Sequence, residues 1–367
     1  MNLAVYITGH GYGHKTRVLE IARALVRNNP KWKIHVRAPF PLNRIIETLG
    51  FEPTSHHSVR LDLGLVQYDA LRADFEKTLQ QLNYYWSDQG DGIVASEAAW
   101  MKRAGIDVAL SDISPRAFDA CKLAKVPCYG VGNFGWDWIW RDLGSLDRRF
   151  IRFADRAAAS YNHCTRLFRT VMNEPMESFP VIEDVPLIAR VSGKTAPELR
   201  RTLNLPLDKK LVLLSFGGEG LSMESFPPAA LYKHFTFITT DPMPDMRHPF
   251  LHLTDDQLNR CGLRYCDLVK AVDIIISKPG YSIVAECVAN QTALLYSNRS
   301  LFAETPLIVE YIQRYLPYAV IGSEETLKGN WESSLVKLEG QMPFNFPPTR
   351  IDGAEVVAGR IYELATQ

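Results

Sequence analysis

The chain has 367 residues, and its 41 lysines and arginines balance its 41 aspartates and glutamates, so the formal net charge is zero. This balance argues against broad nucleic-acid binding and against a polybasic membrane contact. The length suits two domains better than one, and the 46% hydrophobic content is ample for buried cores.

No apolar run approaches the roughly 18 residues that a membrane span needs, and the N-terminus lacks the pattern of a signal peptide. The six cysteines include no Cys-x-x-Cys pair and are too sparse for a disulfide scaffold. We therefore expect a cytoplasmic protein with reduced thiols.

Strands and helices alternate in the first half of the chain. Residues 3–7 form a short apolar run typical of a buried strand, and Val18, Ile21, Ala22 and Leu25 recur at helical spacing after it. The pattern then predicts strands at 32–36, 107–110 and 127–131, and helices at 42–49 and 68–86.

The pattern restarts after a proline-rich stretch, and we place the connection between domains near residues 184–196. Strands are predicted at 211–214, 235–239, 271–276 and 292–296, with helices over 282–289 and 350–367. Two βαβ series in tandem indicate an α/β protein with two doubly wound domains, 1–185 and 190–349, facing across a cleft.

Residues 8–17, Thr-Gly-His-Gly-Tyr-Gly-His-Lys-Thr-Arg, form a glycine-rich turn between the first strand and the first helix. Such a turn directs backbone N–H groups toward whatever lies above the sheet edge. It lacks the Gly-Lys-Ser/Thr ending of a P-loop, and a dinucleotide fingerprint needs no histidine. We interpret it as a turn that presents a proton acceptor.

His14 is the candidate general base, because imidazole titrates near neutral pH and can take a proton from a hydroxyl. The alternative is that His14 only shapes the turn. A metal site with His10 would need both rings on one helical face and further ligands, and Gly11 and Gly13 argue against a regular helix there. We therefore expect no metal.

Asp112 ends a predicted strand and is the candidate partner of His14, whose tautomer it would fix as the acid of a triad does. Alternatively, Asp112 caps the following helix. Because the carboxyl ends of parallel strands share one edge, His14, Asp112 and Asn133 are expected to lie close together. Trp136 and Asp137 follow Asn133 and are candidates for a ligand-facing wall, although buried packing is the commoner role of tryptophan.

Two glycine loops, Gly217-Gly218 and Gly280-Tyr281-Ser282, are each expected to open a helix in the second domain. Glycines let the backbone approach a pyrophosphate, and helix N-termini favour its charge. Glu286 follows the second loop and could accept bonds from ribose hydroxyls. Glu304 follows the next strand and could bond sugar hydroxyls. The alternative for both carboxylates is a solvated surface position.

Taken together, these stretches resemble the glycosyltransferase-like family with the GT-B fold, and within it the N-terminal region of plant-type L-arabinokinases. The matching stretches are 8–17, 111–112, 133–137, 184–187, 216–218, 280–281 with Glu286, and Glu304 with Pro306. The phosphate-binding loop of the arabinokinase kinase half is missing, so kinase activity is not implied. The chain is more distantly similar to nucleotide-sugar-dependent N-acetylglucosaminyltransferases and to plant glucosyltransferases.

The resemblance implies that His14 is the acceptor-side base and that Asp112 orients it. It implies that Glu286 holds the donor ribose, that Glu304 binds the donor sugar, and that the helix at 350–367 crosses back to the first domain. The donor loop departs from the family by reading Ser-Lys-Pro-Gly-Tyr-Ser, in which Lys278 could add positive charge near a phosphate.

We therefore expect an inverting, metal-independent glycosyltransferase that moves a sugar from a nucleotide diphosphate donor, with UDP favoured, to a hydroxyl acceptor. The alternatives are a nucleotide-sugar 2-epimerase and a non-catalytic sugar-nucleotide-binding protein. No further cofactor, nucleic acid or transmembrane segment is expected. Donor-side candidates are Gly217, Gly218, Lys278, Gly280, Tyr281, Ser282, Glu286 and Glu304. Acceptor-side candidates are His10, Gly11, Gly13, Asn133, Trp136 and Asp137.

Overall fold

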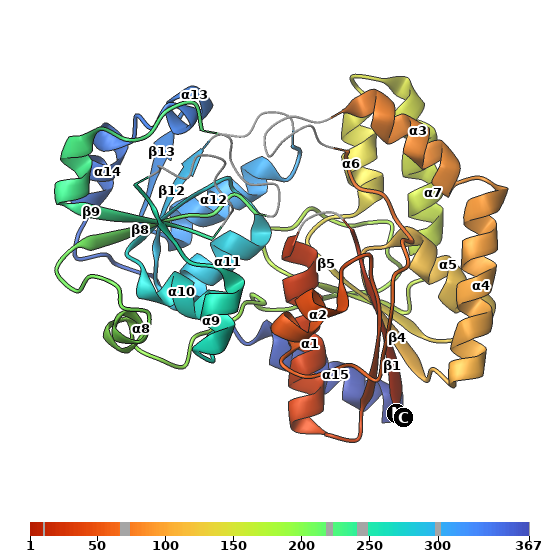
Figure 1. Cartoon of the computed structure of the whole chain (residues 1–367). Coiled ribbons are helices and arrows are strands. Elements are labelled where there is room, and N and C mark those ends of the chain that lie inside the picture. Colours follow the sequence, from red (N-terminus) through yellow and green to blue (C-terminus); the bar gives the residue numbers. More distant parts are fainter. Residues whose placement is uncertain (10–11, 67–73, 218–222, 241–248, 298–301, 367) are drawn as a thin grey trace. The chain divides into compact units, whose positions relative to one another are not determined.

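A computed structural model describes residues 1–9, 12–66, 74–217, 223–240, 249–297 and 302–366 (Figure 1). These residues form two compact units. Unit 1 contains the chain up to residue 189 and again from residue 350, and unit 2 contains residues 190–349. Each unit is built on its own parallel sheet.

The sheet of unit 1 has seven strands in the order β3-β2-β1-β4-β5-β6-β7. Their bounds are β1 Asn2–Ile7, β2 Lys33–Arg37, β3 Ser55–His57, β4 Val108–Asp112, β5 Cys128–Gly132, β6 Arg166–Arg169 and β7 Ile182–Asp184. Every strand pair in this sheet is parallel. The central strands β1, β4 and β5 are almost wholly buried apolar runs, because helices cover both faces of the sheet.

The helices of unit 1 form a layer on each face of the sheet. Figure 1 shows α1 and α15 on one side of the strands and α4, α5 and α7 on the other. The helix bounds are α1 Tyr12–Asn28, α2 Leu42–Leu49, α3 Phe75–Tyr85, α4 Asp88–Ala104, α5 Pro115–Ala124, α6 Trp136–Leu143, α7 Ile151–Tyr161 and α15 Gly353–Thr366. The expected helical face of Val18, Ile21, Ala22 and Leu25 is fully buried.

The sheet of unit 2 has six parallel strands in the order β10-β9-β8-β11-β12-β13. Their bounds are β8 Lys210–Leu214, β9 Phe235–Thr239, β10 Leu251–His252, β11 Ile274–Ser277, β12 Ala293–Ser297 and β13 Tyr318–Ile321. The helices are α8 Ala196–Thr202, α9 Asp255–Arg260, α10 Tyr265–Ala271, α11 Tyr281–Asn290, α12 Thr305–Tyr315, α13 Ser323–Leu327 and α14 Glu332–Glu339. Trp331 is fully buried in this unit's core and stacks on Phe250 with the ring centroids 6.0 Å apart.

Three expectations about helices need correction. Gly13 does not prevent a regular helix, since α1 begins at Tyr12 and includes Gly13 and His14 in its first turn. The long helix expected over 68–86 is shorter in the described residues, where α3 covers Phe75–Tyr85. No helix begins at Gly217 within the described residues, and residues 223–228, after a segment outside the description, are not helical.

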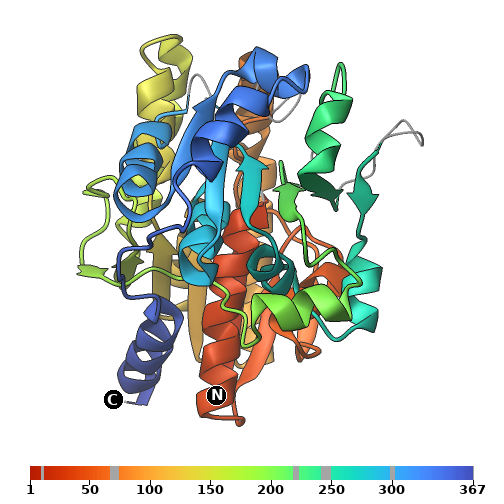
Figure 2. The ribbon, with the colours of Figure 1, turned by 90° about the vertical axis from the view of Figure 1, so that its left-hand side faces the viewer.

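The last helix, α15, packs within unit 1. It lies beside α1 in both views of the ribbon (Figure 2), and Val357, Ala358 and Ile361 join the core cluster that includes β1 and α1. Its start is fixed by the backbone, because Gly353 N–H donates to the carbonyl oxygen of Leu187 at 3.2 Å. None of the helices in the described part of the chain is long and apolar enough to cross a membrane.

Gly353→Ala should destabilise unit 1 by about 1–3 kcal/mol, because an overpacked site forces the backbone to shift. A Cβ at this position would lie 2.2 Å from the carbonyl oxygen of Pro186. The matched control is Gly359→Ala in the same helix, where a Cβ meets nothing within 4 Å. This control should be stabilising by about 0.5–1 kcal/mol through helix propensity. Urea unfolding measures both effects, and equal stability of the two variants would contradict this view of α15.

Candidate active site

The candidate site of unit 1 lies where β1 and β4 end side by side. The two strands are neighbours in the sheet, and Ile7 is paired with Asp112 in their register. The turn after β1 leads into α1, whose first turn carries His14. Two residues far apart in sequence therefore meet at the carboxyl edge of the sheet, as the strand pattern predicts.

His14 and Asp112 form a direct hydrogen bond. His14 Nδ1 lies 2.7 Å from Asp112 Oδ1. Arg17 Nη2 also lies 3.2 Å from Nδ1, but the contact with the carboxylate is the shorter one. Because an ionised carboxylate only accepts hydrogen bonds, we assign the proton to Nδ1, which donates to Asp112 and leaves Nε2 of the neutral ring as the acceptor. This contact excludes the alternative role of Asp112 as a helix cap, and the N-cap of α5 is Ser114. The pair has the tautomer that a general base requires.

Arg17, which the motif analysis did not single out, holds the same carboxylate. Its Nε donates to Asp112 Oδ2 at 2.9 Å and its Nη2 donates to Oδ1 at 2.8 Å, as in a bidentate pair. Its Nη1 donates to Asn133 Oδ1 at 2.8 Å. Arg17 lies one helical turn after His14, so the spacing i, i+3 was the signal available in the sequence. One guanidinium thus joins the ends of β4 and β5 to α1.

These groups are shielded from water, so their charges interact strongly with one another. Asp112 is 0% exposed and Arg17 is 2% exposed, whereas His14 retains 9%. Burial alone would raise the pKa of Asp112, but the adjacent Arg17 guanidinium and His14 outweigh it and hold that pKa below its ordinary value. Asp112 is therefore ionised at neutral pH, and His14 is the member of the pair that can reach solvent.

Aromatic rings pack against His14. The Phe134 ring meets the imidazole edge-on at a centroid distance of 5.6 Å, and Trp136 lies at 6.5 Å. Both aromatic side chains are buried. Trp136 therefore contributes a packed wall beside His14. Asn133, at the end of β5, is buried between Arg17 and the carbonyl oxygen of Met172, to which its Nδ2 donates at 3.3 Å.

A buried carboxylate pair supports that aromatic wall. Glu174 accepts from the backbone N–H groups of Gly135 at 3.2 Å and Met176 at 2.6 Å, and Ser178 donates to Asp137. Burial raises the pKa of both carboxyls, that of Glu174 to about 7, and the charge of Asp137 adds to the effect on Glu174. The sequence pointed to Asp137 but not to Glu174.

Asp62 is a further buried carboxylate and lies beside the glycine turn. Its Oδ1 is 3.4 Å from the backbone nitrogen of Gly9, and Ser114 Oγ donates to its Oδ2 at 3.1 Å. Burial raises its pKa, and hydrogen bonds from Thr8, Ser114 and Gly9 oppose the rise. An aspartate inside the apolar run Leu61–Leu65 was the only sequence signal. His10 and Gly11 lie outside the described residues, and Gly13 accepts a hydrogen bond from Thr16.

The candidate donor side of unit 2 follows the same architecture. Gly280 precedes α11, which begins at Tyr281, and Ser282 follows within its first turn. Gly217 follows β8 with a φ of +79°, a conformation that favours glycine. A Cβ at Gly217 or Gly280 would meet nothing within 4 Å. Lys278 follows β11 and is half-buried, and Gly218 lies outside the described residues.

Glu286 does not lie on a solvated surface. It is 3% exposed, and its Oε1 accepts from Arg190 Nε and Nη2, both at 2.5 Å. Arg190 is also buried and lies over the ring of Tyr265 at 5.7 Å. No motif in the sequence pointed to Arg190, which lies in the stretch between β7 and α8. Glu304 is half-buried at the N-cap position of α12, where its side chain makes no capping bond.

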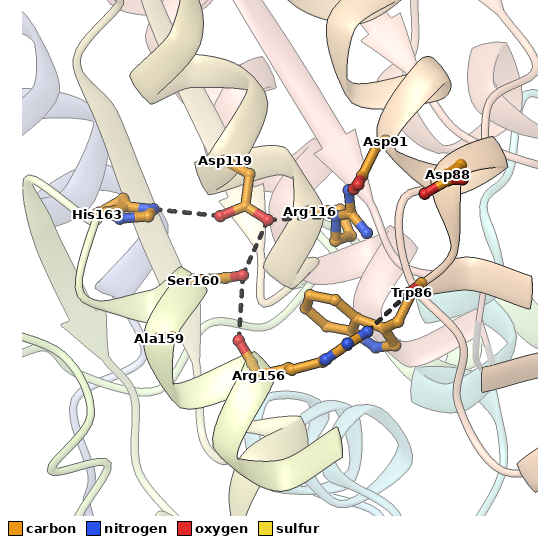
Figure 3. A pocket seen from close by; sticks show the side chains of 9 residues that line it. All are labelled: Trp86, Asp88, Asp91, Arg116, Asp119, Arg156, Ala159, Ser160 and His163. Atoms are coloured by element: carbon orange, nitrogen blue, oxygen red, sulfur yellow. Dashed lines mark hydrogen bonds and ion pairs between the residues drawn. The ribbon is translucent and has the colours of Figure 1, made fainter. Parts of the chain in front are cut away.

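The outer helices of unit 1 enclose a separate polar pocket of about 400 Å³, lined by Trp86, Asp88, Asp91, Arg116, Asp119, Arg156, Ala159, Ser160 and His163 (Figure 3). Arg116 pairs with Asp91 and Asp119 and lies 4.8 Å from the centre of the Trp86 ring. His163 Nδ1 lies 3.1 Å from Asp119 Oδ1. These pairs join α4, α5 and α7, and no predicted site residue lines the pocket.

Two open parallel sheets, each with a glycine turn at its carboxyl edge, define a protein of the GT-B class. Comparisons agree. The solved structure of a UDP-glucosyltransferase from Polygonum tinctorium is similar to this chain, with a TM-score of 0.59 at 13% identity. The match covers 100% of this chain and 93% of that one. Medicago truncatula UGT71G1 complexed with UDP-glucose gives a TM-score of 0.58 at 14% identity, covering 100% of this chain and 98% of that one.

The chain is also similar in sequence to L-arabinokinase of Arabidopsis thaliana. The two are 28% identical over 369 residues, which cover 99% of this chain and 34% of the arabinokinase. The chain thus spans about a third of the length of the relative it matches. No protein-family model matches the chain. These findings confirm the GT-B fold and the resemblance expected from the sequence.

The pair of Glu174 and Asp137 predicts a pH-dependent stability. A carboxyl whose pKa is about 7 in the folded protein and ordinary in the unfolded chain stabilises the fold at low pH. That contribution falls as the pH rises from about 4.5 and is lost above about 7. The wild type should therefore lose about 1–2 kcal/mol more than Glu174→Gln between pH 4.5 and pH 7.5 in urea unfolding. Parallel pH profiles of the two proteins would contradict the assignment.

Proposed function

We propose that the protein is a glycosyltransferase that moves a sugar from a nucleotide diphosphate donor, UDP-linked, to a hydroxyl acceptor. The observation that carries the proposal is the His14–Asp112 hydrogen bond of 2.7 Å at the glycine turn, which leaves Nε2 as a proton acceptor. The structural neighbours support the donor class, since one of them is complexed with UDP-glucose. The kinase activity of L-arabinokinase is not part of the proposal.

In this mechanism, unit 1 binds the acceptor and His14 removes the proton of its attacking hydroxyl. Asp112 acts through His14 as a positioning residue, because its carboxylate fixes the Nδ1–H tautomer and stabilises the imidazolium that forms. Attack on the face opposite the leaving nucleotide inverts the anomeric carbon. The proposed base chemistry needs no metal ion.

The donor is proposed to bind unit 2 at the start of α11. Backbone amides at a helix N-terminus favour a diphosphate, and the glycines at 217 and 280 leave room for its close approach. Lys278 adds positive charge on the same side. Glu286 would accept hydrogen bonds from the ribose hydroxyls, and Glu304 would bond the hydroxyls of the sugar.

A non-catalytic sugar-nucleotide-binding protein is the second candidate. Two observations favour it: Arg190 already holds one oxygen of Glu286, and the chain matches only about a third of a relative that is named for a different activity. Binding of UDP-sugars without release of UDP on any acceptor would favour this candidate over the transferase. Formation of an epimer from the donor in the absence of acceptor would instead indicate a 2-epimerase.

His14→Ala should lower the kcat for release of UDP from a donor panel by about 10²- to 10⁴-fold, the range of general-base catalysis. The donor Kd, measured by calorimetry, should stay unchanged because the base contacts the acceptor. The matched control is His163→Ala, which removes the other histidine of unit 1 that pairs with an aspartate. Activity should persist in this control. Equal turnover of wild type and His14→Ala would remove His14 from the base role.

Glu286→Gln and Glu304→Gln should separate the two parts of the donor. The change at Glu286 should weaken both UDP and UDP-glucose by about tenfold or more, because a charged hydrogen bond to the ribose is lost. The change at Glu304 should weaken UDP-glucose alone. Circular dichroism checks folding, since Glu286→Gln leaves the Arg190 charge buried and uncompensated. Unchanged Kd values in folded Glu286→Gln would mean that the donor site is misplaced.

A further inference from the structure

Asp62 is a buried carboxylate that the proposed reaction has not yet used. It lies in an irregular segment that follows β3 and is 4% exposed. Its neighbours Leu61 and Leu63 are equally buried. A carboxylate is costly to bury without partners, so its position requires a specific reason.

Its partners belong to the two turns that carry the candidate catalytic pair. Gly9, whose N–H faces Asp62, lies in the turn from β1 to α1, which positions His14. Ser114, which donates to Asp62, lies in the turn from β4 to α5, directly after Asp112. The adjacent Leu61 carbonyl also accepts from the backbone N–H of Arg116 at 3.3 Å. Asp62 therefore links one turn to the other.

The turn after Asp112 needs such support. Ile113 has a φ of +51°, a left-handed conformation that costs a β-branched residue about 1–3 kcal/mol. Its carbonyl oxygen is held by the hydroxyl of Tyr161 at 2.8 Å. Ser114, the next residue, donates to Asp62. Two hydrogen bonds therefore hold the strained turn that follows Asp112.

The charges around His14 indicate a second role for Asp62, which is to balance the charge of the protonated imidazole. Arg17 neutralises Asp112 through a bidentate pair, so these two groups together supply no net charge to the imidazole. When His14 takes a proton, the cluster of Arg17, Asp112 and His14 gains an uncompensated positive charge in a buried place. The Asp62 carboxyl accepts hydrogen bonds from the turn that carries His14 and from Ser114, which favour its ionised form. It also interacts electrostatically with His14, so it is placed to supply the missing negative charge.

The other groups near Asp62 do not provide that charge. Tyr85 and Tyr161 are neutral phenols at physiological pH, because burial raises the pKa of each. Arg60 is exposed and Arg116 is paired with Asp91 and Asp119, and both have the opposite sign. Phe134 and Trp136, which pack against His14, carry no charge, and burial raises the pKa of Asp137 and of Glu174, the carboxyls that support this aromatic wall.

We propose that Asp62 is a positioning residue that fixes the two turns of the His14–Asp112 pair and provides the counter-charge for protonated His14. The inference rests on the proposed base role of His14. Arg17 neutralises the charge of Asp112. Asp112 therefore orients the ring, and Asp62 balances the positive charge that the ring gains with the proton. The four groups together are then neutral once His14 has taken up the proton.

Two variants separate charge from position. Asp62→Asn removes the charge and can keep both contacts, since the amide oxygen accepts from Gly9 and the amide nitrogen donates to the Ser114 hydroxyl. Ser114→Ala removes a contact and keeps the charge. NMR of the His14 ring should show Asp62→Asn titrating about 0.5–1 pH unit lower than wild type, and Ser114→Ala titrating with wild type.

Turnover supplies a second readout. In Asp62→Asn, kcat should fall at least tenfold and the acid limb of the kcat/KM profile should move to lower pH. Ser114→Ala should lose only a few-fold in kcat, with the limb in place. Equal titration of the His14 ring in wild type and Asp62→Asn, or an equal shift in Ser114→Ala, would overturn the proposal. The ring titration decides this even if no transferase activity is found.

A reciprocal measurement protects the test against misfolding of Asp62→Asn. Coupling between two titrating groups is mutual. The side-chain carboxyl signal of Asp62 should therefore titrate at higher pH in His14→Ala than in the wild type, because the His14 charge that lowers its pKa is gone. An unchanged Asp62 signal would show that the two groups do not interact and would overturn the proposal.

Discussion

The structure of unit 1 depends on one shared carboxylate. Asp112 is fully buried and is held at the same time by Arg17 and by His14. A buried carboxylate without partners would take up a proton and lose its acceptor character, so the guanidinium is what keeps it ionised. The same guanidinium reaches Asn133 on the neighbouring strand. The geometry of the imidazole is therefore set by a charge network that ties α1 to the ends of β4 and β5.

A similar arrangement recurs in unit 2. Glu286 on α11 is buried and paired with Arg190, as Asp112 on β4 is paired with Arg17. In each unit, a carboxylate with an expected functional role is neutralised by an arginine from another element. Such pairs are strongly destabilising to break from one side, which makes them good at fixing orientation. In each pair, the arginine also neutralises the negative charge of the carboxylate. Further groups are then needed where a reaction creates positive charge, and in unit 1 Asp62 meets that need.

Much of the fold followed from local pattern. The strands at β1, β2, β8, β9 and β12 and the helix α2 occur within a residue or two of their predicted bounds, since buried apolar runs and helical spacing are local properties. The short strands β3, β6 and β7 and the long helix α4 were not foreseen. β3 reads Ser-His-His and α4 contains two glycines near its start, so neither has a clear period. Their structure comes from packing against neighbours that are distant in sequence.

The sequence by itself determined the class of fold and the glycine turn with its histidine, and it predicted that Asp112 and His14 lie at the same sheet edge. These follow from strand order and from the rule that the ends of parallel strands share an edge. Only the tertiary structure identified Arg17, Glu174, Arg190 and Asp62 as the groups that hold the candidate residues. Their roles arise from burial, which turns ordinary charged side chains into obligatory partners, and burial is decided by the packing of the whole domain.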